Sequence, residues 1–231
     1  MHSLYLLINL FSLLPTLLFS FHPKIKFHLH WHVLFPAILS TAFVFVIWDM
    51  YYSHLGIWGF NPTYLSGVYI GNLPVEEILF FICIPYACLF TYFCLGKFIK
   101  KAYLKKAEKT ITVLLISGLT CLSAFYFPNL YTSVAFLLLA VVLFALQYVF
   151  KITWLNRFYV AYLFLLIPFM IVNGLLTGTG LENPVVWYNP QHIIGLRILS
   201  IPVEDIFYGM LMLLCSVSIY EFLQKKQKEP A

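Results

Sequence analysis

Two short acidic motifs carry the residues of this sequence that are best suited to chemistry. The first is Pro74-Val75-Glu76-Glu77 and the second is Pro202-Val203-Glu204-Asp205, and an apolar run follows each. A carboxylic acid that stays neutral in apolar surroundings is a proton donor, and an ionised neighbour is a base. We therefore predict acid–base catalysis by Glu76, Glu77, Glu204 and Asp205.

The two motifs belong to an internal duplication. They lie 128 positions apart, and the same offset relates Asn61-Pro62 to Asn189-Pro190 and Gly67 to Gly195. Chance readily gives one Pro-x-acid-acid motif, but hardly a second with flanking matches in the same register. The chain thus contains the same structural unit twice: a turn, an acidic motif and an apolar helix.

Composition places these motifs in a membrane protein. Of the 231 residues, 62% are hydrophobic and 10% are charged, whereas soluble domains are about 25% charged. Stretches near or above ~18 apolar residues are typical of membrane-spanning helices. Seven are expected, at 3–21, 33–51, 75–95, 111–127, 131–149, 158–176 and 203–222. Lysines lie between the spans and form no basic domain, which argues against a nucleic-acid partner.

The spans predict an all-α polytopic fold of two parallel three-helix repeats joined by a connector helix. The expected parts are a first repeat at 1–96, a basic inner loop with the connector at 97–129, a second repeat at 130–224 and a polar tail at 225–231. A shift of four helices keeps both repeats in one orientation, related by an axis along the membrane normal. The irregular segments 53–73 and 177–200 are expected to be interfacial or re-entrant.

The positive charges predict the orientation. With the N-terminus outside, 13 of the 14 Lys and Arg residues fall on the inner side, and Arg197 is the exception. We expect a cytoplasmic-membrane protein with its C-terminus in the cytoplasm. Six acids then gather near the outer ends of the spans: Asp49, Glu76, Glu77, Glu182, Glu204 and Asp205.

A structural explanation of the acidic pairs stays open, because acids in the first turn of a helix are an ordinary helix start. Their duplication favours function, since acids at membrane depth are expensive. Neighbouring residues point about 100° apart on a helix. One acid of each pair is expected to face the interior while the other orients it or pairs with Arg197. The expected supporting residues are Asp49, Arg197, Asn61 and Asn189.

Aromatic side chains surround both pairs. An aromatic face stabilises a cation by roughly 0.5–2 kcal/mol, so acids and aromatic faces in hydrocarbon suit protonation of an alkene in a lipid-soluble substrate. For any single aromatic, packing or an interfacial belt is the more common role. The expected substrate-binding residues are Trp58, Phe60, Phe80, Phe81, Trp187, Tyr188, Phe207 and Tyr208.

Over nearly its whole length the sequence resembles the non-flavin lycopene cyclases of bacteria, archaea and fungi. These occur as two small membrane subunits or as one fused chain. The first half of the resemblance rests on Trp48-Asp49, Phe60-Asn61-Pro62, Gly67 and Leu73 to Glu77 with Phe80-Phe81. The second rests on Gly178 to Tyr188, Gly195-Leu196-Arg197 and Ile201 to Asp205 with Tyr208-Gly209. Both halves are present, as in the fused form.

The resemblance implies redox-neutral cyclisation of the ψ end groups of lycopene, or of a related acyclic carotene, to β-ionone rings, giving γ-carotene or β-carotene. It implies catalytic roles for Glu76 and Glu77, which the duplication extends to Glu204 and Asp205 with Arg197 as a partner. No redox cofactor is required for this reaction. Interfacial histidines are favoured over a metal site at His28, His30 and His32, so no metal is expected.

Two other functions use the same residues. The acids of a proton-coupled transporter would form a relay, and a carotenoid- or lipid-binding membrane protein would hold its ligand without turnover. Whether one or both ends react, which ring forms, whether there is one pocket or two, and whether the chain forms a homo-oligomer stay open.

Overall fold

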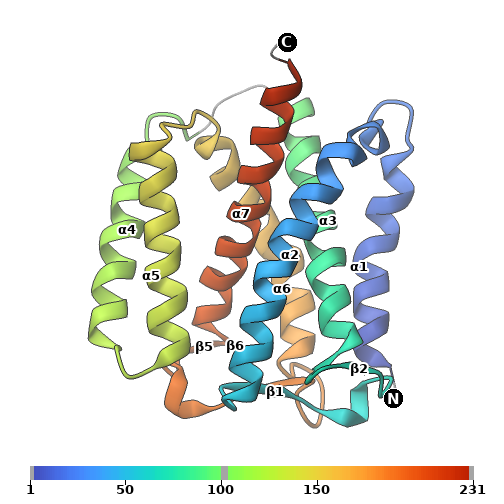
Figure 1. Cartoon of the computed structure of the whole chain (residues 1–231), viewed down its shortest axis with the longest axis vertical. Helices are drawn as coiled ribbons and strands as arrows, with labels where there is room; N and C mark the ends of the chain where they lie inside the picture. The colour runs from blue at the N-terminus through green and yellow to red at the C-terminus, as the bar shows by residue number, and fades with distance from the viewer. Residues whose placement is uncertain (1–2, 100–103, 229–231) are drawn as a thin grey trace.

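The computed structural model describes residues 3–99 and 104–228 and shows a bundle of long helices (Figure 1). Lys100 and Lys101 of the expected basic loop and Glu229 of the expected tail lie outside the described residues. Within the described ranges the long helices are α1 (Leu4–Ser20), α2 (Trp31–His54), α3 (Val75–Phe98), α4 (Glu108–Phe125), α5 (Leu130–Phe144), α6 (Leu155–Leu176) and α7 (Val203–Lys228).

Each expected span corresponds to one of these helices, so the prediction of an all-α polytopic fold is confirmed. Six are long and apolar enough to cross a membrane, with the fifth span formed by α5 and the π-helical turn η3 (Ala145–Val149) that continues it. The seventh, α1, is apolar but has 17 residues. At about 1.5 Å per residue it is about 25 Å long, slightly less than the ~30 Å hydrocarbon core.

Short strands and turns gather at the end of the bundle where the N-terminus lies, and the C-terminus lies at the opposite end (Figure 1). The segment after α2 contains β1 (Trp58–Phe60), η2 (Pro62–Tyr64), β2 (Tyr69–Ile70) and β3 (Leu73–Pro74). The segment after α6 contains β4 (Val186–Tyr188), η4 (Pro190–His192), β5 (Arg197–Ile198) and β6 (Ile201–Pro202). A further short helix, η1 (Phe27–His30), precedes α2 at the other end.

The antiparallel pairing of β1 with β4 reveals how the two halves are related. Trp58 pairs with Tyr188, Gly59 with Trp187 and Phe60 with Val186. Under the 128-residue offset this pairing maps onto itself, because Gly59 and Trp187 are equivalent positions. A pseudo-twofold axis therefore passes through that pair. A Cβ at Gly59 would lie 2.4 Å from the Trp187 ring, so only glycine fits opposite the tryptophan without displacing it.

The same symmetry governs the connections around this small sheet. The backbone N–H of Asn61 donates to the Val185 carbonyl, and the backbone N–H of Asn189 donates to the Ile57 carbonyl, both at 2.8 Å. The side chains of Asn61 and Asn189 also accept from the backbone two residues on, which caps η2 and η4. Two similar halves are thus present, each with three long helices, and α4 lies outside both.

Two hairpins place the acidic motifs. β2 pairs with β3 and β5 with β6, and each second strand leads directly into a helix. The proline that ends it, Pro74 or Pro202, suits this position because its fixed φ is compatible with a helix start. Helices α3 and α7 therefore begin at Val75 and Val203, with both acids in the first turn.

Helices α3 and α7 form the centre of the bundle. α1 packs on α3, α5 on α7, and α2 contacts both central helices, while α4 packs on α5 at the edge (Figure 1). At the end of the bundle that holds the C-terminus, Arg157 of α6 forms an ion pair with Glu221 of α7 and donates to the Tyr92 hydroxyl of α3. These contacts join α3, α6 and α7 at that end.

Candidate active site

All four motif acids are buried at the start of α3 and α7, but they face two different ways. Glu76 and Glu204 are fully buried, and each binds the backbone of its own repeat. Glu76 Oε1 accepts from the Ser66 amide and Glu204 Oε1 accepts from the Ile194 amide, both at 2.6 Å. Since Ser66 and Ile194 are equivalent under the offset, the first acid of each pair holds the preceding loop against its helix.

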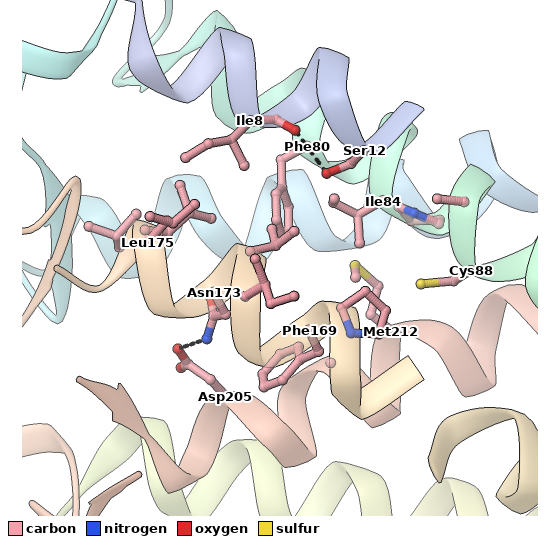
Figure 2. Close-up of a pocket in the computed structure, with 18 of the residues that line it drawn as sticks. Ile8, Ser12, Phe80, Ile84, Cys88, Phe169, Asn173, Leu175, Asp205 and Met212 are labelled. Atoms are coloured by element: carbon pink, nitrogen blue, oxygen red, sulfur yellow. Dashed lines mark hydrogen bonds between the residues drawn. The ribbon is translucent and has the colours of Figure 1, made fainter. Parts of the chain in front are cut away.

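The second acid of each pair lines a cavity of about 660 Å³ enclosed mainly by α1, α3, α6 and α7. Glu77 of the first repeat and Asp205 of the second both border it, and so does Asp49 of α2. Figure 2 shows Asp205 beside Asn173, with Phe80, Phe169 and Met212 around the space. One apolar cavity therefore contains a carboxyl group from each repeat.

The two acids differ in their hydrogen-bond donors. Glu77 accepts one bond, from the Tyr5 hydroxyl at 2.5 Å. Asp205 accepts three, from Tyr131 at 2.7 Å, Asn173 at 2.7 Å and Tyr188 at 2.9 Å. Donors favour the ionised form of a carboxyl group, so the surroundings of Asp205 stabilise a carboxylate better than those of Glu77.

A cluster of aromatic rings closes the strand end of the cavity. Trp58 lies with its ring centroid 5.0 Å from Tyr131 and 6.2 Å from Tyr208, and Tyr131 stacks on Tyr188 at 5.9 Å. All four rings line the cavity, together with Phe60 and Phe80. Two acids with different hydrogen-bond donors, beside aromatic faces in a mainly apolar cavity, suit the formation and quenching of a carbocation.

Comparison with known proteins identifies this arrangement. The family model described as lycopene cyclase matches residues 2–95 and 128–223. The chain belongs to the lycopene cyclase family. No curated protein and no solved structure matches it. Both matched segments occur in one chain, as in the fused form of the family, and α4 lies between them. The chain is therefore a carotenoid cyclase with a carotenoid substrate, embedded in a membrane by its apolar helices.

Several expected substrate-binding residues of the cyclase do line the cavity, namely Trp58, Phe60, Phe80, Tyr188 and Tyr208. Three others lie elsewhere. Phe81 packs against Phe80 and Phe45 in the core, Phe207 packs against Phe136, and Trp187 is exposed on the outer side of the strands. Adjacent positions on a helix point about 100° apart, so Phe81 and Phe207 turn away where Phe80 and Tyr208 face the cavity. Side chains on a strand alternate between its two faces, so Trp187 points away from the cavity that Tyr188 lines.

The expected supporting residues of the cyclase have separate positions. Asp49 is buried at the cavity, close to Glu77 and Trp58. Asn61 and Asn189 cap turns, as described above. Arg197 is exposed, donates to the Ser200 carbonyl at 2.5 Å and lies over the Tyr188 ring. Among the described residues it forms no ion pair with an acid, so the expected pairing of Arg197 with a motif acid is not present.

Three hydrogen-bond donors to the acids of the cyclase cavity were not expected from its sequence: Tyr5, Tyr131 and Asn173. Tyr5 and Tyr131 each lie in the first turn of the first helix of a repeat. A tyrosine shared by these two positions is the sequence signal that would have indicated them. Asn173 is a polar residue inside the apolar helix α6. Tyr188, which lies outside the spans on β4, has its pKa raised well above the ordinary value by burial and by the nearby Asp205 carboxylate. It therefore stays a hydrogen-bond donor.

The two loop-holding acids predict a difference in stability. Replacing Glu204 with Ala leaves the Ile194 amide and the Thr132 hydroxyl without their acceptor, whereas Glu76→Ala strands the Ser66 amide alone. Each orphaned donor costs about 1–3 kcal/mol, so we expect Glu204→Ala to lower the free energy of unfolding of the cyclase more. Thermal unfolding of the purified variants in one detergent measures this. Equal midpoints for the two variants would contradict it.

Proposed function

We propose that the chain is a lycopene β-cyclase that closes ψ end groups by acid catalysis without net oxidation or reduction. The observation that carries the proposal is the placement of Glu77 and Asp205, one acid from each repeat, in one apolar cavity beside aromatic rings. A carboxylic acid is strong enough to protonate an alkene only when water does not compete for the proton, and burial between helices supplies that condition.

In the proposed mechanism Glu77 is the proton donor. Its protonated carboxyl transfers H⁺ to the terminal double bond of the end group, which leaves a tertiary cation and the Glu77 carboxylate. The Tyr5 hydroxyl donates to that carboxylate and stabilises it. The electron pair of the neighbouring alkene attacks the cation, so one carbon–carbon bond forms and the ring closes.

Asp205 is the base in the same mechanism. Ring closure moves the positive charge into the ring, and loss of one ring proton to Asp205 forms the ring double bond. The three donors around Asp205 keep it ionised until that step. Glu77 loses one proton and Asp205 gains one, so the substrate is isomerised without a change in composition. The return of a proton from Asp205 to Glu77 then completes the cycle. No redox cofactor enters this balance.

The faces of Trp58 and Tyr208 stabilise the cations between these steps. Such contacts are worth roughly 0.5–2 kcal/mol each where the cation is not hydrated. Glu76 and Glu204 act as positioning residues in this proposal, because they hold the loops that end at the cavity. Asp49 of α2 borders the same cavity and is a supporting residue in this proposal.

The proposed orientation places the cavity near the outer leaflet of the cytoplasmic membrane. The basic connections after α1, α3 and α5 lie at the same end of the bundle as the C-terminus, opposite the strands and the acids (Figure 1). Positive charge on the inner side then puts the N-terminus outside.

Expression in a bacterial host that accumulates lycopene tests the function. We expect β-carotene or γ-carotene among the extracted pigments after chromatography, and the ratio measures how often the second end reacts. Unchanged lycopene, with the protein folded in the membrane, would contradict the proposal. A reduced or oxidised product would contradict the redox-neutral mechanism.

A further inference from the structure

The cavity is open on one side of the bundle. Five of its lining residues are also exposed at the surface, including Leu7 at 47% and Phe11 at 73% on α1, and Ile171 at 63% and Leu175 at 36% on α6. Figure 2 shows the space between these two helices, with Leu175 on one side and Ile8 on the other. Since both helices are apolar, this gap between α1 and α6 faces hydrocarbon.

The equivalent gap in the pseudo-symmetric structure is filled. Under the repeat, α2 takes the place of α6, and the offset puts Phe45 where α6 has Asn173 and Trp48 where α6 has Leu176. The Phe45 and Trp48 rings pack on each other at 5.6 Å, and each lies 5.2 Å from the Tyr208 ring. Two large rings thus occupy the volume that is open beside α6.

A second pair of aromatic rings also fills the equivalent gap. Phe136 of α5 packs on Phe207 of α7 with ring centroids 5.0 Å apart. The corresponding position to Phe136 on α1 is Ile8, which lines the open cavity. The two gaps are therefore unequal at equivalent positions, because the rings of Phe45, Trp48 and Phe136 are replaced by smaller side chains beside the open gap.

The length of the cavity bears on how much substrate it holds. Along α3 its lining extends from Glu77 to Thr91, which is about 21 Å at 1.5 Å per residue. An acyclic C40 carotene is about as long as the ~30 Å hydrocarbon core. One end group and part of the polyene fit inside with the end group at the acids, and the remainder must leave through the open side.

We propose that the gap between α1 and α6 is the entrance by which one end of a carotene passes from the lipid to Glu77 and Asp205, and that the two ends react in successive binding events. This inference rests on the proposed function. It assigns Ile171 and Leu175 to the entrance, and it assigns Phe45 and Trp48 to the closure of the second gap.

The repeat supplies a matched pair of variants. The double variant Ile171→Trp/Leu175→Trp narrows the entrance, and Phe43→Trp/Ile47→Trp places the same rings at the equivalent positions of α2. Phe43 and Ile47 are also exposed to the surface but do not line the cavity. All four side chains are exposed on the surface of apolar helices, so a larger ring there does not overpack the core. A third variant, Ile171→Ala/Leu175→Ala, widens the entrance and guards against a general folding defect.

Two quantities are measured in lycopene-accumulating cells: cyclised carotenoid per amount of protein, and lycopene that remains bound to the purified protein. We expect Ile171→Trp/Leu175→Trp to lower both by about tenfold or more, since overpacking of a narrow passage is strongly unfavourable. The α2 pair should stay within about twofold of the wild type, and the alanine pair should keep or increase both.

Equal effects of the two tryptophan pairs would overturn the proposal. So would formation of the bicyclic product without any released monocyclic product at early times. If the wild type binds lycopene but cyclises none, the proposed function fails, while the bound lycopene of the variants still decides whether the gap is the entrance.

Discussion

Replacing Glu77 with Gln is expected to lower carotene cyclisation by at least about 100-fold, the lower range of what general acid catalysis contributes. The amide has nearly the same shape and can still accept from the Tyr5 hydroxyl, but it has no acidic proton to give to the alkene. Cyclised end groups per amount of protein and per hour measure the loss. Lycopene that co-purifies with the variant should stay unchanged, because the apolar lining is intact.

A matched control is Glu182→Gln, which makes the same chemical change at the same end of the bundle on an exposed residue that does not line the cavity. Its activity should equal that of the wild type. If Glu77→Gln keeps more than about a tenth of the activity, another group protonates the substrate, and Asp49 would be the next residue to test. Loss of bound lycopene in Glu77→Gln would instead indicate a role in binding.

Replacing Asp205 with Asn is expected to cause a loss of similar size, about 100-fold, for a different reason. The first protonation can still occur, but the ring cation loses its proton acceptor. The new amide group also turns two N–H donors toward a site built from donors, the Tyr131, Tyr188 and Asn173 side chains. We expect the residual product to contain rings with a displaced double bond, because deprotonation then occurs at whichever carbon meets another acceptor.

Asp205→Glu distinguishes loss of the base from loss of structure, since it keeps the carboxylate on a longer side chain. It should retain more activity than Asp205→Asn and should keep the β-type ring as the main product. Chromatography of the ring isomers measures both variants. An unchanged isomer ratio at reduced rate in Asp205→Asn would show that Asp205 does not choose the proton that leaves, and the assignment of the base would fail.

The sequence by itself determined the elements of the fold. Hydrophobic runs as long as a bilayer is thick identify spanning helices, because backbone polar groups inside a membrane must be satisfied within the segment. The offset of 128 residues also predicted two halves in one orientation, and the reciprocal register of β1 and β4 shows the axis that relates them. The two acidic motifs were found because acids beside long apolar runs are rare.

Tertiary structure alone decided which acid of each pair meets the cavity. Adjacent positions on a helix diverge by about 100°, but the direction of the cavity depends on how α1 and α6 pack against α3 and α7. The donors to Glu77 and Asp205 come from residues distant in sequence, Tyr5 and Tyr131, at separations of 72 and 74. A pattern read along the chain carries no information on such pairs.

The inequality of the two repeats is also a tertiary property. Phe45 and Trp48 look like ordinary core or belt aromatics in the sequence, and Asn173 looks like an isolated polar residue in an apolar helix. Their roles depend on volume, because large rings on α2 fill the space that smaller and polar side chains on α6 leave open. The sequence thus determined that two equivalent acidic sites exist, and packing decided that they share one cavity with one open side.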